Sequence, residues 1–530
     1  DVYKRQSWPR AETCSSEEFC YEGRCGGDCA RAGVYRSYEG CEYVAATLMN
    51  SQVPPDFVPA VVVSNRNDDA VSVTVTQRTS VIAEVEVAPR STRTIELPWV
   101  TTLRGDGAGY SVNAPGAAYR IESSSPVTVY QFNPLEYGLD RDCSSGDVVV
   151  GDGVCYSYTN DASLLLPVPV LTEHYIVMSR PNLGIRLTVE GGTQEEHLFS
   201  PSVLAVINPH DRPVTVDLLL SADTAADGLG RSFVAGETAT YTIEPLGVLQ
   251  IAARSPTECV PDWSEPETYP CGTDIECRYG YCSLEGHDLT GTEVVSSDPV
   301  AVFGAHDCDF IPFNRWACDH LEEQLFPYET WGRRFVATQS LREQGEPDLF
   351  RVLSGSDGNE VRFSPASVHE TVTLDRGEHV ELEAHGAFEI SAGGPLLVGQ
   401  FLVGQSYVGF DLEELPPGDP SFSLVVPVEQ YRTAYNFLAP DTFDRSFVNV
   451  TTTDEGTDSV HVDGESLAAA QWEEVGDSTG YRTVRHEIAA GSHVIASDDD
   501  VPFGITVYGY GQFTSYMYPG GLDLEPIAVW

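Results

Sequence analysis

Residues 119–132 read YRIESSSPVTVYQF, in which a polar strand pattern ends in three serines and Pro126 precedes an apolar strand pattern. Stretches of the same plan surround three further prolines: TEVVSSDPVAVFGA (Pro299), FEISAGGPLLVGQF (Pro395) and HVIASDDDVPFGITVYGYG (Pro502). Because proline fixes φ and donates no backbone hydrogen bond, we expect each of these prolines at the start or edge of a strand. The recurrence predicts a chain built from about four copies of one β-unit.

Each copy also carries hairpins in front of its proline. A first hairpin with a polar turn begins at Val61, Leu204, Phe350 and Phe447, and in the fourth copy the second hairpin runs straight into the proline segment. Apolar and polar residues alternate at 71–77, 81–87, 213–219 and 371–384, which predicts half-buried strands. Helical periodicity is confined to short stretches, for which we expect short helices: YVAATLMN (43–50), DHLEEQL (319–325) and LAAAQW (467–472).

A connector recurs between the copies. It carries an acid, an apolar stretch, a proline and then a strand led by an aromatic residue: NDASLLLPVPVLTEHYIVMS (160–179), CDHLEEQLFPYETWGRRFVATQ (318–339) and GDPSFSLVVPVEQYRTAYNFLAP (418–440). The repeats and connectors predict an all-β protein with about four tandem antiparallel β-modules and disulfide-stapled loops. We expect the modules to be sandwich-like, with a closed, propeller-like arrangement as the alternative.

The same pattern predicts the organisation of the chain. Residues 1–6 (DVYKRQ) resemble translated sequencing-adapter sequence, so we interpret them as an adapter-derived artefact that stands in place of the true N-terminus. The remaining segments are a Cys-rich N-terminal segment (7–56), β-module 1 (57–160), β-module 2 (161–333, with a Cys-rich insertion at 255–287), β-module 3 (334–430) and β-module 4 (431–530).

Composition limits the partners of this chain. It has 530 residues, with 80 Asp and Glu against 30 Lys and Arg, and a formal net charge of −50. Nucleic-acid partners are excluded by this balance, because phosphate recognition depends on lysine and arginine. Aromatic residues make up 10% of the chain, which argues against intrinsic disorder. We find no run of 18 apolar residues and therefore predict no membrane span.

The 13 cysteines lie at short intervals that do not match zinc-site spacing. C-x5-C-x4-C occurs twice in Gly- and Tyr-rich loops, which is typical of a disulfide framework formed in an oxidising compartment. The candidates are Cys29 with Cys41, Cys143 with Cys155, Cys308 with Cys318, and two further bridges among Cys259, Cys271, Cys277 and Cys282. This framework predicts a secreted or cell-surface protein whose signal peptide was lost with the truncated N-terminus.

One cluster has the composition of a metal site: His306, Asp307, Asp309, Asp319, His320, Glu322 and Glu323. We expect these residues instead to face solvent in a loop closed by Cys308 and Cys318. The acid-rich stretches DRDCSSGD (140–147) and 498–500 could hold a structural Ca²⁺, although neither has a recognised calcium motif, so solvated surface charge is the preferred interpretation. No catalytic, cofactor or metal residue is therefore assigned.

Other short motifs are discounted. Arg104-Gly105-Asp106 spells an integrin-type tripeptide of a kind that arises by chance, and the sequon at Asn449 falls inside a predicted strand. Four tyrosines lie near the last strands, and strand packing is preferred over a binding face for them: Tyr508, Tyr510, Tyr516 and Tyr518. The chain lacks G-x-S-x-G, H-E-x-x-H, P-loop and dinucleotide fingerprints.

Several segments resemble the N-terminal domain family of IgG Fc-binding protein, which also occurs in secreted and surface proteins of the myxobacterial type. The similarity lies in residues 119–134, 160–179, 291–336 and the closing FGITVYGYGQFTSYMYPGG (503–521), and 291–336 is its most specific part. This resemblance implies a secreted or surface binding module. It assigns no ligand-binding residue, and it does not establish binding of IgG Fc.

From these observations we predict a non-enzymatic secreted or cell-surface binding or adhesion module that recognises a protein or glycan partner. Its loops would supply the recognition surface on a rigid scaffold. Two alternatives remain open: a secreted hydrolase with a site formed between modules, and a structural component of an extracellular matrix. Turnover of glycan or peptide substrates would favour the first alternative, and self-association would favour the second.

Overall fold

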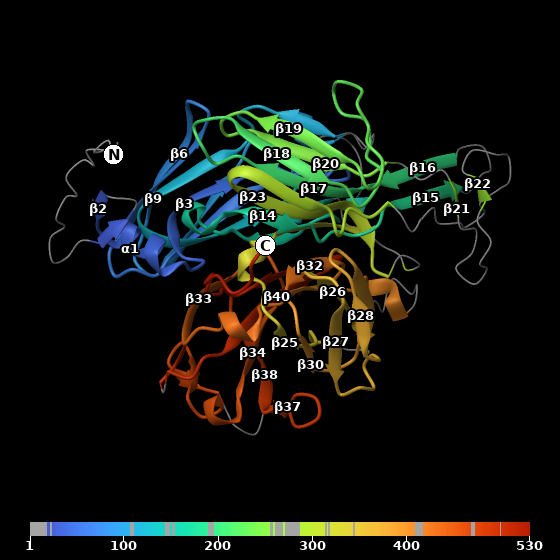
Figure 1. Cartoon of the computed structure of the whole chain (residues 1–530). Coiled ribbons are helices and arrows are strands. Elements are labelled where there is room, and N and C mark those ends of the chain that lie inside the picture. The colour runs from blue at the N-terminus through green and yellow to red at the C-terminus, as the bar shows by residue number, and fades with distance from the viewer. Residues whose placement is uncertain are drawn as a thin grey trace, which may run out of the picture.

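The computed structural model describes residues 19–21, 24–105, 111–141, 143, 149–150, 154–188, 195–254, 258–259, 269–270, 287–312, 315, 318–342, 345–408, 417–467, 472–498 and 500–530. Nearly all regular structure in these ranges is antiparallel β-sheet (Figure 1). α-Helix is confined, within the same ranges, to α1 (Asp28–Tyr35) and the single turn α2 (Thr101–Arg104). The predicted all-β class is confirmed.

Each of the four modules consists of two sheets, and one stretch of chain passes from the first sheet into the second, so that it contributes a strand to both. In module 1 this path is β9 (Tyr119–Phe132), whose residues 119–123 pair with β5 (Val71–Gln77) and whose residues 128–132 pair with β4 (Ala60–Asn65). The strand therefore leaves one sheet and enters the other. β23 (Glu293–Phe310) crosses in the same way in module 2, and these two modules come close to closed barrels.

The modules repeat one strand order. The first sheets are β6 (Ser80–Val87)–β5–β9–β3 (Gly40–Ala45), β19 (Thr238–Ile243)–β18 (Val214–Leu219)–β23–β14 (Thr172–Ile176), β28 (Val372–Leu374)–β27 (Asn359–Ser364)–β30 (Phe388–Ala392)–β25 (Arg334–Ala337), and β36 (Glu465–Ser466)–β35 (Val460–Val462)–β39 (Gly491–Ser497)–β33 (Ala434–Ala439). The second sheets are β7 (Ser91–Glu96)–β4–β9–β13 (Ala162–Leu164), β8 (Val112–Ala114)–β20 (Val248–Ala252)–β17 (Ser202–Ile207)–β23–β24 (Cys318–Gln324), β29 (His379–Ala384)–β26 (Asp348–Ser354)–β31 (Leu396–Leu402)–β32 (Ser421–Leu424), and β37 (Glu473–Glu474)–β38 (Tyr481–Ile488)–β34 (Arg445–Thr453)–β40 (Gly504–Gly511)–β41 (Thr514–Pro519).

The four repeated prolines lie where the path changes sheets. Pro126 falls between the two pairing segments of β9, and Pro299 falls in the corresponding part of β23. Both therefore lie inside continuous strands, so the expectation of a strand start is wrong for these two. A residue between two ladders has no β-sheet hydrogen bond to donate, which is why proline is tolerated there. Pro395 and Pro502 precede β31 and β40 as expected.

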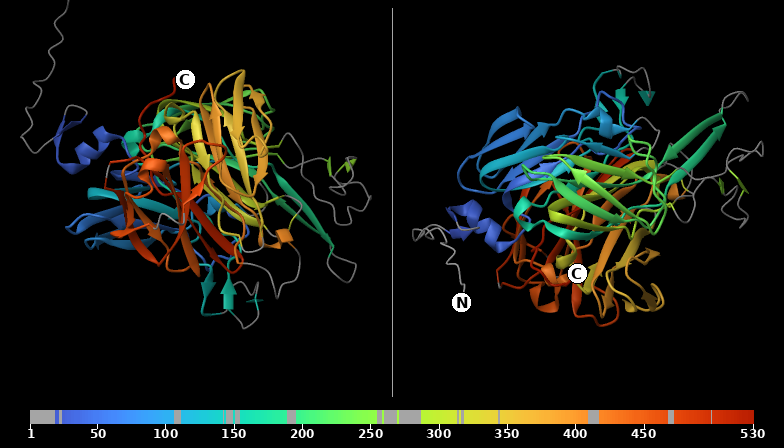
Figure 2. Two further views of the ribbon diagram at one scale, coloured as in Figure 1. Left: turned by 90° about the horizontal axis from the view of Figure 1, so that it is seen from below. Right: turned by 45° about the horizontal axis from the view of Figure 1, so that its top comes forward.

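The modules close around one axis. Each connector leads from the second sheet of one module, through a 3₁₀ turn, to the first sheet of the next; the turns are η1 (Val168–Val170), η2 (Tyr328–Thr330) and η4 (Val428–Gln430). The last strands of the second sheets meet in a cycle, in which β24 contacts β13 and β32, and β41 contacts the same two strands. Modules 1 and 2 consequently lie over modules 3 and 4 (Figures 1 and 2), so the ring alternative describes the arrangement better than a row.

Two of the predicted helices are wrong, because neither segment is helical in the structure. Residues 43–45 belong to β3, and residues 319–324 belong to β24. Helix propensity is a weak preference that tertiary contacts override, and both segments complete a sheet edge beside β9 or β23. The third stretch, 467–472, lies mostly outside the described residues.

Packing is continuous through the ring. The largest hydrophobic cluster runs from Tyr38 to Ala528 through all four modules, whereas the interior of module 3 holds a separate cluster around Phe350 and Val398. The four tyrosines of β40 and β41 are buried, which agrees with the packing interpretation. In the described ranges, no helix has the length and apolar character needed to cross a membrane.

Three predicted disulfides are present. They join Cys29 to Cys41, Cys143 to Cys155 and Cys308 to Cys318. The first ties α1 to β3 with a Cα–Cα distance of 5.6 Å. Cys271, Cys277 and Cys282 lie outside the described residues, as does the side chain of Cys259, so their pairing stays a prediction. The residue limits of the modules likewise stay a prediction.

Candidate functional site

A cavity of about 780 Å³, the junction cleft, opens where α1 meets modules 1 and 4. α1 supplies one wall. The two sheet-crossing prolines of these modules line the cleft, and the segment at Asp523 and Glu525 forms another border; the two prolines are Pro126 and Pro502. The cleft therefore gathers residues from both ends of the chain at a point where three structural units meet.

Ion pairs hold the base of the junction cleft. Glu39 is buried and lies 2.9 Å from Arg66 Nε, and Arg432 pairs with Asp523. Asn436 Nδ2 donates to Glu39 Oε1 at 3.3 Å, which fixes the carboxylate from the side of β33. Because modules 1 and 4 both contribute to this network, the base of the cleft also stabilises the closure of the ring.

The α1 wall presents exposed apolar and aromatic surface. Tyr35 lines the cleft with 56% of its surface exposed, and neighbouring Val34 is 46% exposed. The guanidinium of Arg31 lies 5.5 Å from the centre of the Tyr35 ring, a distance that permits a cation–π contact. Exposed tyrosine and arginine around a concave surface are typical of recognition sites.

The chemistry of the junction cleft fits recognition. Among the described residues, its lining offers guanidinium, carboxylate, hydroxyl and amide groups, together with two tyrosines, and includes no histidine or cysteine. The described lining therefore contains no histidine that could act as a general base and activate a nucleophile. Polar groups of both signs on a rigid frame suit hydrogen bonding and ion pairing with a large polar partner.

The metal-like cluster is not on the surface. All seven of its residues are buried, and the expectation that they face solvent is wrong. Both faces of β24 are covered, because this strand lies at the ring axis between β13 and β32 as well as beside β23. A substrate in solvent therefore cannot reach these groups in the closed ring.

Hydrogen bonds explain how the ring tolerates this cluster. Asp307 accepts two bonds of 2.6 Å from the backbone and hydroxyl of Ser51, and Asp309 accepts one of 2.8 Å from Arg180. Glu322 accepts bonds from Gln131 and Asn133 at 2.9 and 3.1 Å. The acids thus connect β23 and β24 to neighbouring segments.

The structure adds a residue that the sequence did not single out. Asp161 precedes β13 and accepts bonds from Glu322 N at 2.9 Å, Ser421 Oγ at 2.6 Å and Phe422 N at 3.2 Å, so it joins three axial strands. It is the acid of the first connector, just as Asp319 is the acid of the second. The connector repeat was therefore the signal that could have found it.

Three carboxyl groups at the ring axis have raised pKa values. Asp319 Oδ2, Glu323 Oε2 and Asp419 Oδ1 are buried and have no hydrogen-bond partner in the described structure. Burial raises the pKa of all three side chains well above its usual range, and repulsion from Asp419 and Asp161 adds to the effect at Asp319. We therefore expect these groups to be neutral over much of the acidic range.

Within the described residues, the side chains of the metal-like cluster do not converge on a common point as metal ligands would. The only set of three His, Cys or acidic side chains with ligand atoms within 4.8 Å of one another, among the described residues, is Asp56, Cys143 and Cys155. The two cysteines of that set are joined as a disulfide. The residues expected to be solvated instead serve as hydrogen-bonding groups of the ring.

The remaining motifs have structural surroundings that explain their residues. Arg104 donates to Val53 O, and its guanidinium lies 5.5 Å from the Trp99 ring centre; residue 106 is outside the described part. Asn449 is buried and donates to Thr338 Oγ1 at 3.1 Å, so its sequon is closed to modification in the folded chain. Asp498 pairs with a histidine, whereas most of 140–147 and residue 499 are not described.

Comparison with known proteins adds a family relationship. A family model described as IgGFc binding protein matches residues 161–509, which is more than half of the chain. The IgGFc-binding protein of Homo sapiens is 21% identical over 360 residues, a match that covers 68% of this chain and 6% of the human protein. The matched part therefore spans a small fraction of that relative.

Proposed function

Because the chain belongs to the IgGFc-binding protein family, we propose that it is an extracellular or cell-surface binding module that recognises a protein or glycan partner at the junction cleft. The observation that carries this proposal is the exposed Tyr35 beside a mixed-charge cavity of about 780 Å³. A volume of this size falls in the range of ligand-binding pockets in proteins.

The proposed binding mode uses a preorganised surface. The Cys29–Cys41 disulfide anchors α1, and the Arg66–Glu39 pair holds the opposite side. Side chains that are already held in place lose less conformational entropy on binding, which favours affinity. Three disulfides in the described residues support an oxidising, extracellular location.

The test measures binding of the whole chain to defined ligands. We would immobilise it and measure biolayer interferometry with human IgG Fc, enzymatically deglycosylated Fc, a secreted mucin and a glycan array. The human relative is named for binding IgG Fc, so Fc is the first protein to test. Glycan recognition predicts loss of the signal after deglycosylation, whereas protein recognition predicts that the signal is retained.

Variants locate the site. Tyr35→Ala and Arg66→Ala should each weaken binding about tenfold, as expected for anchor residues of an interface. Arg90→Ala is the control, because Arg90 forms an exposed pair with Asp68 at 2.7 Å outside the cleft. Unchanged binding of both cleft variants would exclude this cleft, and cleavage of the ligand detected by mass spectrometry would favour the hydrolase alternative.

A further inference from the structure

The outer edge of β6 is the longest open strand edge among the first sheets of the four modules. Within the described residues, each of these sheets ends in a strand that pairs on one side only; these strands are β6, β19, β28 and β36, with 8, 6, 3 and 2 residues. β6 pairs with β5, and no described residue of another segment forms a hydrogen bond with the backbone of residues 81–86. Figure 1 shows β6 at the outer border of module 1.

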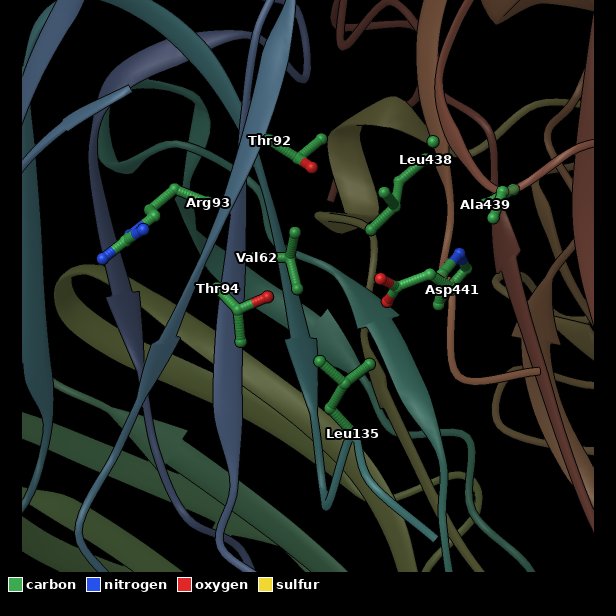
Figure 3. Close-up of a pocket in the computed structure, with 11 residues that line it drawn as sticks. Val62, Thr92, Arg93, Thr94, Leu135, Leu438, Ala439 and Asp441 are labelled. Atoms are coloured by element: carbon green, nitrogen blue, oxygen red, sulfur yellow. The ribbon is translucent and has the colours of Figure 1, made fainter. Parts of the chain in front are cut away.

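Other strands at comparable positions have their edges covered. β7, which follows β6 in the chain, contacts β39 of module 4. Figure 3 shows Thr92 of β7 on the opposite side of a cavity of about 410 Å³ from Leu438 of module 4. In module 2, Asn113 of β8 donates to Thr242 O at 2.9 Å, which ties the edge of β19 to the second sheet of its own module. β6 therefore differs from these strands in having a long edge that faces solvent.

The two faces of β6 differ in chemistry. A β-bulge at Ile82 interrupts the pairing, and residues 83–87 then pair with β5 in regular register. Ala83 and Val85 are partly buried and pack against the main hydrophobic cluster, so their remaining surface extends the core to the edge of the sheet. Glu84 and Glu86 alternate with them and are exposed. The edge thus combines free backbone groups, an incomplete apolar face and an acidic face.

We propose that residues 83–87 of β6 bind an extended segment of a protein partner as an added β-strand, with lysine or arginine side chains beside Glu84 and Glu86. Alternate residues of an edge strand direct their N–H and C=O groups away from the neighbouring strand, and an added strand bonds to them. Opposite charges on adjacent strands stabilise the pairing. Apolar residues between the basic ones pack beside Ala83 and Val85.

The charges argue against a second copy of this chain as the added strand. Antiparallel pairing of two β6 strands about a two-fold axis at Val85 places Glu84 of one copy opposite Glu86 of the other, and like charges in that position destabilise a sheet. The bulge at Ile82 also shortens the regular edge, a feature that limits association between edges. β6 does not line the junction cleft, so this proposal does not depend on the function proposed there.

The test measures binding of the whole chain to a fluorescein-labelled heptapeptide of alternating valine and lysine by fluorescence anisotropy. The comparison peptides are a rearrangement of the same residues without alternation and an alternating valine–glutamate peptide. We expect the alternating basic peptide to bind about tenfold more tightly than either, because strand addition here needs both the alternation and the positive charge. Equal affinity for the two basic peptides would overturn the proposal, since it would show attraction by net charge alone.

N-methylation of the peptide tests the backbone hydrogen bonds. One peptide is methylated on its valine nitrogens and another on its lysine nitrogens, so that each loses alternate N–H donors and keeps its side chains and charge. An added strand directs only alternate N–H groups toward β6, so one methylated peptide should lose binding and the other should retain it. Loss in both peptides, or retention in both, would overturn the proposal.

Charge reversal on β6 locates the site. The double variant Glu84→Lys and Glu86→Lys should weaken binding of the alternating basic peptide about tenfold and should bind the valine–glutamate peptide more tightly than the wild type does. The matched control is Glu473→Lys with Glu474→Lys, which makes the same change of charge on β37, an exposed edge of two residues in module 4. This control should bind the basic peptide as the wild type does.

Two results with these proteins would contradict the assignment. An equal loss of binding in both double variants would show that the overall charge, and not β6, attracts the peptide. A dimer of the wild type in light scattering, with the amides of β6 protected from hydrogen exchange, would assign this edge to a second copy of the chain.

Discussion

Arg351→Met tests how the ring is held at the junction of modules 2 and 3. Arg351 lies on β26 and is buried, and its guanidinium donates to Ser179 O at 2.7 Å, Asp288 Oδ2 at 2.6 Å and Glu381 Oε2 at 2.9 Å. Methionine keeps most of the side-chain volume but leaves the acids without this partner. Breaking a buried ion pair from one side costs about 3–5 kcal/mol, and we expect a destabilisation of this size at pH 7.

Asp288 contributes to the free energy of unfolding through its depressed pKa. Burial alone would raise its pKa, but attraction to Arg351 and His379 and bonds from Thr290 lower the pKa of Asp288 to about 2 from its usual 3.8. The difference corresponds to about 2 kcal/mol of stability above pH 4. Because the folded-state pKa is depressed, this stability is present above the unfolded value and is lost as the pH falls toward 2.

The variant should therefore have a distinct pH dependence. Without Arg351, Asp288 no longer keeps a depressed pKa, so the stability gap between wild type and variant should narrow by about 2 kcal/mol from pH 5 to pH 2. His379 gives a second readout, because burial and the charge of Arg351 lower its pKa to about 4. That pKa should rise toward 6.5 in the variant.

Urea unfolding at pH 7, 5 and 2 measures the stability gap, and NMR titration of selectively labelled histidines measures the pKa of His379. Arg362→Met is the matched control, because Arg362 pairs with Glu360 on the exposed face of β27 in the same module. Loss of an exposed pair costs at most about 1 kcal/mol. Equal urea midpoints for the two variants at pH 7, or an unchanged His379 pKa in Arg351→Met, would refute the reasoning.

Three further outcomes are expected. Burial, with repulsion from neighbouring acids, raises the pKa of Asp319, so ionisation of this group destabilises the fold as the pH rises above the ordinary 3.8. The stability of Asp319→Asn relative to the wild type should therefore increase between pH 4 and 8. A difference in thermal midpoint that does not change with pH would contradict this. Replacing Cys308 and Cys318 by alanine opens a bridge of sequence separation 10 and should cost about 3 kcal/mol in urea unfolding, with no further effect of reductant at this bridge. Gly304→Ala places a Cβ against a backbone oxygen and should destabilise by about 3 kcal/mol or more, whereas Gly228→Ala meets no atom within 4 Å and should unfold at the wild-type midpoint.

Local patterns predicted much of the fold because strands, turns and short disulfides depend on nearby residues. The alternation at 71–77 and 213–219 corresponds to β5 and β18, and the short spacing of Cys308 and Cys318 matches an observed bridge. The repeated prolines indicated four related units, and they mark the crossing between two sheets in each of them. Two-residue periodicity cannot show that a strand such as β9 serves two sheets.

These local patterns could not predict the candidate sites. Residues of the junction cleft extend from Asp28 to Glu525, so only the closure of the ring brings them together. The acids of the connectors were visible as a repeat, but their role depends on strands that approach from other modules.

The segment 319–324 shows most directly which properties depend on the sequence alone and which depend on the tertiary structure. Its sequence has acids at the spacing of a helix surface, and it was predicted to be helical and solvated; in the structure it is β24, buried at the axis. Sequence alone determined the β-class, the repeat and the three short disulfides, because each depends on residues close along the chain. Tertiary structure decided which polar residues are buried and where cavities open, because burial depends on neighbours hundreds of residues away.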